Sequence, residues 1–148
     1  MSKSYTLIEV IIVVGVLAIL TGLASLSLVS FSQAGDIEAA KTIVGGALRE
    51  AQANSEARID DKPWGVYLET NRVVIFSDSG SGYVANAPTN STRVLPNKTT
   101  LSWNLTGGGD DLEFSLRSGQ PTKTGTITFS GSAAKTQVLT INTQGMIE

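Results

Sequence analysis

Near its start the chain reads Lys3-Ser4-Tyr5-Thr6-Leu7-Ile8-Glu9-Val10, and none of the residues 10–35 carries a charge. This uncharged run is dominated by Val, Ile, Leu and Ala. At about 1.5 Å per residue, about 20 such positions form a helix long enough to cross a hydrocarbon layer about 30 Å thick. We therefore expect an N-terminal transmembrane helix.

The charges on either side of the apolar run predict its orientation. Lys3 precedes the run, and Asp36 and Glu38 follow it. Because the positively charged flank of a membrane helix stays in the cytoplasm, we expect the N-terminus inside and the rest of the chain outside. Two simpler interpretations are a plain single-pass anchor and a cleaved secretory signal, for which residues 24–27 offer a weak cleavage site. Neither explains Glu9, a carboxylate at the mouth of a membrane helix.

The junction between the polar start and the apolar run resembles a known processing site. It is similar to the class III leader and N-methylation site of type IV pilins and type II secretion pseudopilins, in which a small residue precedes Phe-Thr-Leu-Ile-Glu-Val. Ser4 stands where that family usually has Gly, Tyr5 stands where it has Phe, and residues 6–10 match as they are. The resemblance implies that a prepilin peptidase cleaves between Ser4 and Tyr5 and methylates the new amine of Tyr5.

The same resemblance implies that the apolar helix stays on the processed protein and assembles a filament. The residues expected to carry assembly at its start are Thr6, Leu7, Ile8, Glu9 and Val10. Among staggered parallel helices, the Glu9 carboxylate of one subunit would meet the N-terminal amine of Tyr5 on its neighbour. An unpaired charge in that apolar setting costs several kcal/mol, so the pair would set the register of the subunits. Alternatively, Glu9 simply complements the positive end of the helix macrodipole.

Beyond Gly35 the pattern changes from wholly apolar to amphipathic. Apolar residues recur at the three- and four-residue spacing of one helix face, while charged residues mostly fall elsewhere. These apolar positions are Ile37, Ala40, Val44, Ala47, Leu48 and Ala51. We expect one long helix, bent or broken near Gly35, whose second half at residues 36–58 packs on the protein's own sheet. No proline interrupts it before Pro63, which favours a minor over a major filament subunit.

After Pro63 the period switches to two, as is typical of β-strands separated by turns rich in Gly, Asn, Ser and Asp. The expected strands are residues 64–69, 72–77, 83–85, 92–95, 100–105, 112–117, 124–130 and 137–142, of which the first two form a hairpin. The predicted fold class is α+β, a long N-terminal helix packed on an antiparallel sheet in the manner of a type IV pilin. The expected segments are a leader at 1–4, a transmembrane and assembly helix at 5–35, and an exported domain at 36–148 that is β-rich over 64–148.

The end of the chain carries a second resemblance. The stretches Phe114-Ser-Leu-Arg-Ser-Gly119-Gln-Pro121, Gly125-Thr-Ile-Thr-Phe129 and Val138-Leu-Thr-Ile-Asn142, followed by Gly145, are similar to the closing strands of H-type minor pseudopilins and their minor-pilin relatives. Members of this group that serve DNA uptake have a basic residue after the last glycine, where this chain has Met146. Together with a net charge of −2, this residue argues against DNA as a partner.

Composition narrows the chemistry further. The 148 residues include neither Cys nor His, which excludes disulfides, thiolate metal sites, cysteine nucleophiles and histidine general bases. We therefore expect no enzymatic activity and no cofactor. Asp110, Asp111 and Glu113 are weak candidates for Ca²⁺ ligands, because they gather carboxylates in and beside a loop. Roles in turns and in solubility are the simpler interpretation of these residues.

The expected function is that of a structural subunit of a type IV pilus-like filament or a type II secretion pseudopilus, with a minor subunit favoured. The family implies as partners other subunits, the prepilin peptidase, an inner-membrane platform protein with a cytoplasmic ATPase, and membrane lipid before assembly. The subunit would begin as a single-pass protein of the cytoplasmic membrane and end in an extracellular pilus or a periplasmic pseudopilus. A major pilin of the filament shaft and a membrane-tethered adhesive, DNA-binding or ligand-binding domain stay open as alternatives.

Overall fold

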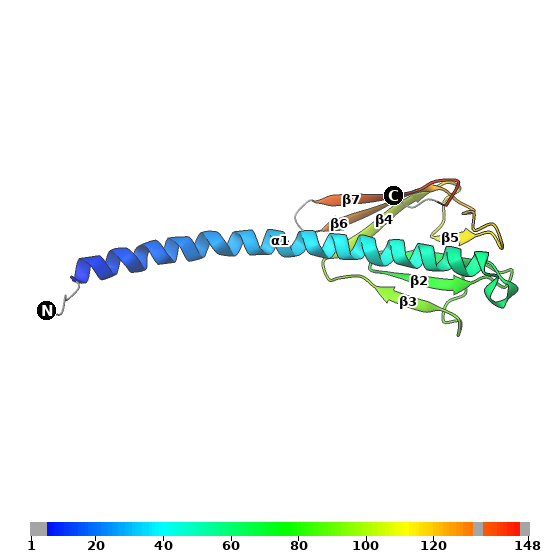
Figure 1. Cartoon of the computed structure of the whole chain (residues 1–148), viewed down its shortest axis with the longest axis horizontal. Helices are drawn as coiled ribbons and strands as arrows, with labels where there is room; N and C mark the ends of the chain where they lie inside the picture. The colour runs from blue at the N-terminus through cyan, green and yellow to red at the C-terminus, as the bar shows by residue number, and fades with distance from the viewer. Residues whose placement is uncertain (1–5, 132–134, 146–148) are drawn as a thin grey trace.

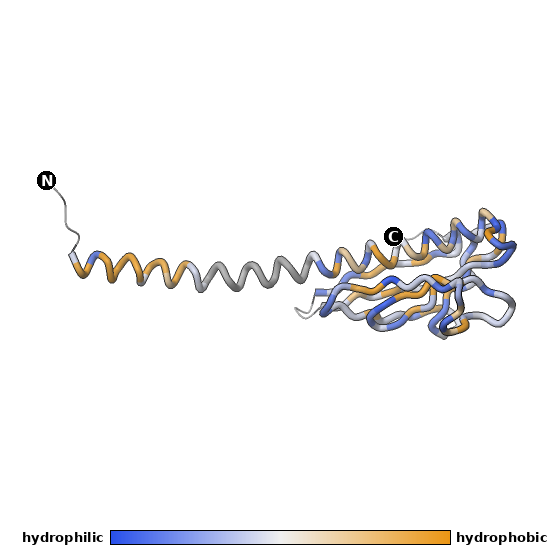
Figure 2. The backbone as a smooth tube through the Cα atoms, turned by 90° about the horizontal axis from the view of Figure 1, so that it is seen from below, coloured by the Kyte–Doolittle hydropathy of each residue, from blue (hydrophilic) through white to orange (hydrophobic). Residues whose placement is uncertain are grey.

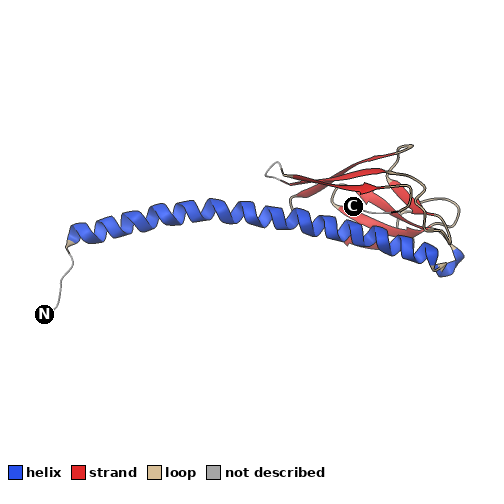
Figure 3. Cartoon of the chain, turned by 45° about the horizontal axis from the view of Figure 1, so that its top comes forward, coloured by secondary structure: helices blue, strands red, loops and turns tan. Residues whose placement is uncertain are grey.

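The computed structural model describes residues 6–131 and 135–145, with residues 23–34 described by their backbone alone. One helix, α1 (Leu7–Glu56), accounts for 50 residues and passes Gly35 without a break. Figures 1 and 3 show α1 as a gently curved rod whose C-terminal half lies against all the strands and whose N-terminal half extends away from them. Of the two forms expected near Gly35, the broken helix is therefore wrong.

The C-terminal half of α1 is amphipathic, as its spacing predicted. All six positions of the predicted stripe are buried: Ile37, Ala40, Val44, Ala47, Leu48 and Ala51 are each at most 2% exposed. They form one hydrophobic core with the inner faces of the strands. The helix is followed by a short 3-10 helix, η1 (Ile59–Asp61), after which the chain enters the first strand.

Within the described residues, seven strands form two antiparallel sheets rather than the single sheet that the sequence predicted. The first sheet has the order β3-β2-β1-β5 and contains β1 (Trp64–Glu69), β2 (Arg72–Ser77), β3 (Ser91–Val94) and β5 (Asp111–Phe114). The second has the order β4-β6-β7 and contains β4 (Thr99–Leu105), β6 (Gly125–Gly131) and β7 (Thr136–Ile141). Figure 1 shows β4, β6 and β7 above α1 and β2 and β3 below it.

A glycine turn separates the two sheets. After β4 the chain passes through Gly107, Gly108 and Gly109, all with positive φ, and then enters β5 on the other sheet. Glycine adopts this left-handed backbone without steric cost, so three in succession allow the abrupt change of direction. The strand pattern on either side of the turn carries no signal of this change, which is why the sequence predicted one sheet.

The first two predicted strands are confirmed residue for residue, and they pair as a hairpin in which Glu69 lies opposite Arg72. The strand predicted at residues 83–85 is wrong, because this segment lies in a loop. In that loop Asp78 Oδ1 accepts hydrogen bonds from the backbone N–H groups of Gly80, Ser81 and Gly82, at 2.7, 2.9 and 2.7 Å. These bonds turn the chain back over the sheet instead of letting it extend along the edge.

The loop before β6 fastens the sheets to the end of α1. Gln52 Nε2 donates to the Gly119 carbonyl at 3.2 Å, and the Arg117 N–H donates to the Ser55 carbonyl at 3.0 Å. The Ser55 hydroxyl also accepts from the N–H of Trp64 at 2.8 Å. The C-terminal half of α1 is therefore an integral part of the head and is anchored at its end by hydrogen bonds.

Candidate assembly surface

The start of α1 is fixed by its own side chains. Thr6 is the N-cap, with extended backbone angles, and its Oγ1 accepts a hydrogen bond from the N–H of Glu9 at 3.4 Å. The Thr6-Leu7-Ile8-Glu9 sequence has the Ser/Thr-x-x-Glu spacing of a capping box. Thr6 matched the processing motif, and its capping role was missed, although this spacing could have revealed it.

Glu9 lies in the first turn of α1 and is exposed. Together with Val10, Val13 and Val14 it lines a shallow hollow of about 350 Å³ on the helix surface. A carboxylate in the first turn interacts favourably with the positive end of the helix macrodipole. The arrangement places one negative charge beside an apolar depression, with no basic side chain among the residues that line it.

Large apolar side chains on the N-terminal part of α1 are uncovered all the way around, and we call them the apolar sleeve. The sleeve consists of Leu7, Ile8, Val10, Ile11, Ile12, Val13, Val14, Val16, Leu17, Ile19 and Leu20, which are 50–80% exposed. Figure 2 shows this end of the helix as a hydrophobic segment projecting from a head with mixed polarity. An apolar surface of this extent on a protein marks contact with lipid or with other protein.

Within the described residues, no helical stretch is both long enough and apolar enough to cross a membrane.

The structure describes all of the predicted assembly residues but not the predicted processing residues. Leu7, Ile8 and Val10 lie with Glu9 in the first turns of α1, all exposed. Ser4 and Tyr5, the predicted cleavage and methylation residues, lie outside the described residues.

Two of the three weak Ca²⁺ candidates have side-chain partners within the protein. Asp110 Oδ1 accepts from Trp103 Nε1 at 3.1 Å, and Asp111 forms an ion pair with Lys123 at 3.0 Å. Burial raises the pKa of Glu113, and the nearby charges of Asp78 and Asp111 raise it further. In the part of the chain that the structure describes, no group of three carboxylates is arranged to hold a metal ion.

Two solved structures share this fold. The type IV minor pilin FimU of Pseudomonas aeruginosa aligns with a TM-score of 0.61 and 14% identity, over 80% of this chain and 90% of FimU. The minor pseudopilin EpsH of the Vibrio cholerae type 2 secretion system aligns with a TM-score of 0.57 and 15% identity, over 76% of this chain and 94% of EpsH. No family model and no curated protein sequence matches the chain. The fold is therefore pilin-like, as predicted, with an N-terminal helix packed on two antiparallel sheets in place of the one that was predicted.

Proposed function

We propose that this chain is a structural subunit of a type IV pilus-like filament or of a type II secretion pseudopilus, and that it polymerises through the apolar sleeve. The observation that carries the proposal is the division of α1, whose C-terminal stripe is buried in the head while its N-terminal side chains are at least half exposed. The pilin-like fold supports the same function, because the sleeve projects where subunits of such a filament would bundle their helices. The proposed role is mechanical rather than catalytic.

Assembly in this proposal begins with processing. A prepilin peptidase cuts between Ser4 and Tyr5 and methylates the amine of Tyr5, while the segment at 5–35 holds the subunit in the cytoplasmic membrane with its head outside. A platform protein and a cytoplasmic ATPase then extract the subunit into a pilus or a periplasmic pseudopilus. Apolar burial contributes about 25 cal/mol per Å² relative to water and much less relative to lipid, so helix packing in the filament depends on close contact.

Glu9 would set the register of the assembled helices. Its carboxylate stands at the edge of an apolar hollow, where a neighbouring subunit's N-terminal amine would be drawn to it as water is excluded. Removing one partner of a buried ion pair typically costs about 3–5 kcal/mol, because the other charge is left unpaired. Helices that pack out of register leave both charges unpaired, so one geometry is selected.

A minor subunit is favoured over a major pilin of the shaft. The described helix contains no proline between Leu7 and Glu56, and the two solved structures with this fold are described as a minor pilin and a minor pseudopilin. The number of copies in purified filaments separates the two possibilities: a few copies per filament indicate a minor subunit, and thousands indicate the shaft.

The test combines N-terminal mass spectrometry with filament recovery. The full chain is expressed with a prepilin peptidase and the remaining filament components, as wild type, Glu9→Gln and the matched control Glu38→Gln, which alters an exposed carboxylate further along the same helix. We expect wild type to begin with N-methyl-Tyr5 and to enter sheared filaments. We expect Glu9→Gln to remain in the membrane with at least about a tenfold loss from filaments, and Glu38→Gln to assemble normally.

Two results would contradict the proposal. An intact Met1 in cells with active peptidase shows that the leader is not processed. Normal filament recovery of Glu9→Gln shows that this carboxylate does not select the register.

A further inference from the structure

A loop covers the face of the first sheet that points away from α1. We call residues 78–90, between β2 and β3, the cover loop. Its Tyr83 ring stacks on Tyr67 of β1, with centroids 3.9 Å apart and planes inclined by 11°, and meets Phe76 edge-on at 5.5 Å. Val74 and Phe76 are buried beside it, although neither belongs to the core that includes α1. The cover loop is thus held on the outer face by aromatic packing.

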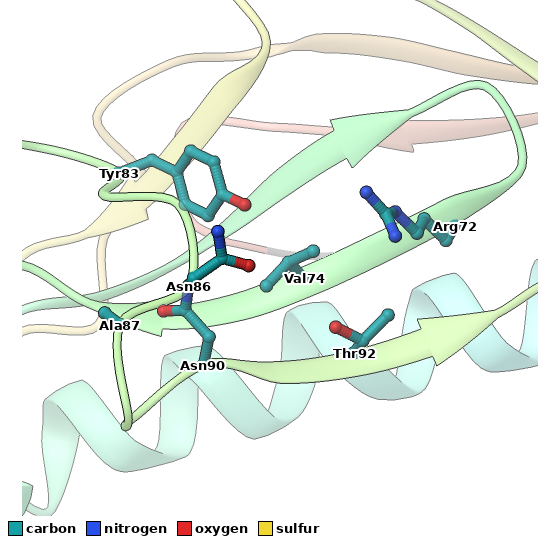
Figure 4. A pocket seen from close by; sticks show the side chains of 7 residues that line it. All are labelled: Arg72, Val74, Tyr83, Asn86, Ala87, Asn90 and Thr92. Atoms are coloured by element: carbon teal, nitrogen blue, oxygen red, sulfur yellow. The ribbon is translucent and has the colours of Figure 1, made fainter.

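A polar pocket of about 280 Å³ lies between the cover loop and strands β2 and β3. Its lining comes from both sides: Arg72 and Val74 of β2, Thr92 of β3, and Tyr83, Asn86, Ala87 and Asn90 of the cover loop. Val74 lies directly opposite Thr92 in the strand pairing. Figure 4 shows the Tyr83 hydroxyl, the Asn86 amide and the Arg72 guanidinium directed toward the same space above Val74, with the helix behind the sheet.

The groups in this pocket both donate and accept hydrogen bonds. Amide and hydroxyl side chains supply N–H and O–H donors together with oxygen acceptors, which matches a ligand made of hydroxyl groups. Asn90 Nδ2 donates to the Val84 carbonyl at 2.9 Å, which holds this amide in place at the edge of the pocket.

Charge around the pocket argues against an anionic ligand. Its cation, Arg72, already donates from Nε to Glu69 Oε2 at 2.7 Å, so its charge is largely neutralised. Partial burial raises the pKa of the neighbouring Tyr67, and the negative charges of Asp110 and Glu69 raise it further. The carboxylates of Glu69 and Asp110 near Tyr67 therefore oppose an anion on this face. A neutral polar ligand enters without repulsion, whereas a phosphate or carboxylate does not.

We propose that the pocket binds one sugar unit of a neutral saccharide. Its volume of about 280 Å³ lies just below the range of about 300–1,000 Å³ for small-molecule sites, which suits a single ring. The backbone hydrogen bonds to Asp78 and the Tyr67–Tyr83 stack preorganise the cover loop, so little ordering cost falls on binding. The pocket lies on the side of the sheet opposite α1, so the proposal stands whether or not the apolar sleeve assembles filaments.

The test uses the unassembled full chain in a detergent that has no sugar headgroup. Glucose, galactose, mannose and N-acetylglucosamine are titrated one at a time and followed by saturation-transfer NMR, with inorganic phosphate and acetate as anionic probes. Two variants alter the pocket: Asn86→Gly, chosen because Asn86 has a φ of 61° that glycine accepts, and Thr92→Val, which removes only a hydroxyl. Thr140→Val removes an exposed hydroxyl from β7 of the other sheet and is the matched control.

We expect at least one sugar to saturate with a millimolar Kd, and each pocket variant to weaken it by about three- to tenfold, the effect of one hydrogen bond. Thr140→Val should bind as wild type does. Near-ultraviolet circular dichroism of the tyrosine pair checks that each variant keeps the cover loop in place. Failure of all four sugars to saturate overturns the proposal. Equal binding by the pocket variants and wild type overturns the site, and preferential binding of phosphate or acetate overturns the ligand class.

Discussion

The two halves of α1 are made of similar apolar residues but have opposite surroundings. In the C-terminal half, one stripe is at most 2% exposed because both sheets cover it, and the remaining faces carry charges and small residues. Over residues 7–20, the large apolar side chains on every face of the helix are 50–80% exposed. A helix that is apolar all round is stable only when other molecules surround it. The comparison separates the residues that fold this protein from those available to assemble it.

Side-chain size follows the same division. The buried stripe uses Ala40, Ala47 and Ala51 between larger residues, which lets strands approach the helix backbone closely. The sleeve instead uses Ile, Val and Leu at nearly every position, which presents a broad surface and no groove shaped for one partner strand. Folding therefore relies on close packing between the strands and the buried stripe of α1, whereas the sleeve presents a large apolar surface to other molecules.

The largest expected effect comes from truncating the same residue type in each half. Leu48→Ala removes a side chain with no exposed surface, and we expect the free energy of unfolding to fall by about 2–5 kcal/mol. Leu17→Ala truncates a side chain that is 56% exposed, and we expect a change within about 0.5 kcal/mol. Urea unfolding of the detergent-solubilised full chain, followed by tryptophan fluorescence, measures both.

Equal losses of unfolding free energy in the two leucine variants would contradict the difference between the halves, because they would show that the sleeve contributes to folding of the head. A second measurement tests the role of the sleeve separately. Leu17→Ala, although neutral for folding, removes apolar area from the proposed assembly surface, and filament recovery under the conditions used for Glu9→Gln reports that loss separately.

Replacing one glycine by alanine in each region tests the same difference between the packed head and the apolar sleeve, and we expect a smaller effect on the free energy of unfolding. A Cβ at Gly65 would lie 2.7 Å from the Leu112 carbonyl oxygen and 2.8 Å from Phe76 Cζ, whereas a Cβ at Gly15 meets nothing within 4 Å. We expect Gly65→Ala to lower the free energy of unfolding by about 1–3 kcal/mol through overpacking. Gly15→Ala should leave unfolding of the head unchanged and favour the helix locally by about 1 kcal/mol. Urea unfolding and amide exchange along α1 measure these two effects.

A loss of head stability in Gly15→Ala would show that the two halves are energetically coupled. An unchanged Gly65→Ala would show instead that β1, β2 and β5 adjust around the added methyl group without cost.

Strong local patterns made much of this fold predictable. The stripe from Ile37 to Ala51 repeats over four turns of helix, and every predicted position is buried. The β1–β2 hairpin was predicted to the residue because alternating strands flank the short turn Thr70-Asn71. Both signals lie within one element or between neighbours in sequence, where periodicity and turn chemistry determine the structure.

The rest depends on contacts between distant residues. Residues 83–85 alternate like a strand, but the Tyr83 ring stacks on Tyr67 across the outer face of the first sheet, which holds this segment in the cover loop. The division into two sheets depends on where β5 pairs, and its partner β1 lies more than 40 residues earlier. The pocket was missed for the same reason, since its residues share no motif and meet only when the cover loop folds back. At the assembly surface, residues 6–10 stood out because they are contiguous.

The smallest expected effect concerns a carboxyl within the folded head. Glu113 has a pKa raised by burial and by the charges of Asp78 and Asp111, with Lys123 opposing them. A raised pKa means that the folded protein prefers the neutral carboxyl, so its contribution to stability is fully present below the ordinary glutamate pKa and is lost as pH rises through the raised value. We expect Glu113→Gln to remove that loss and to be the more stable protein at neutral pH, by less than about 1 kcal/mol because water screens a partly exposed group.

Urea unfolding between about pH 4 and pH 7 measures the difference in unfolding free energy between variant and wild type. The titration of all other carboxyls cancels in this difference. A difference that does not change with pH would mean that the charge of Glu113 is fully solvated in the head, like a carboxylate on the open surface.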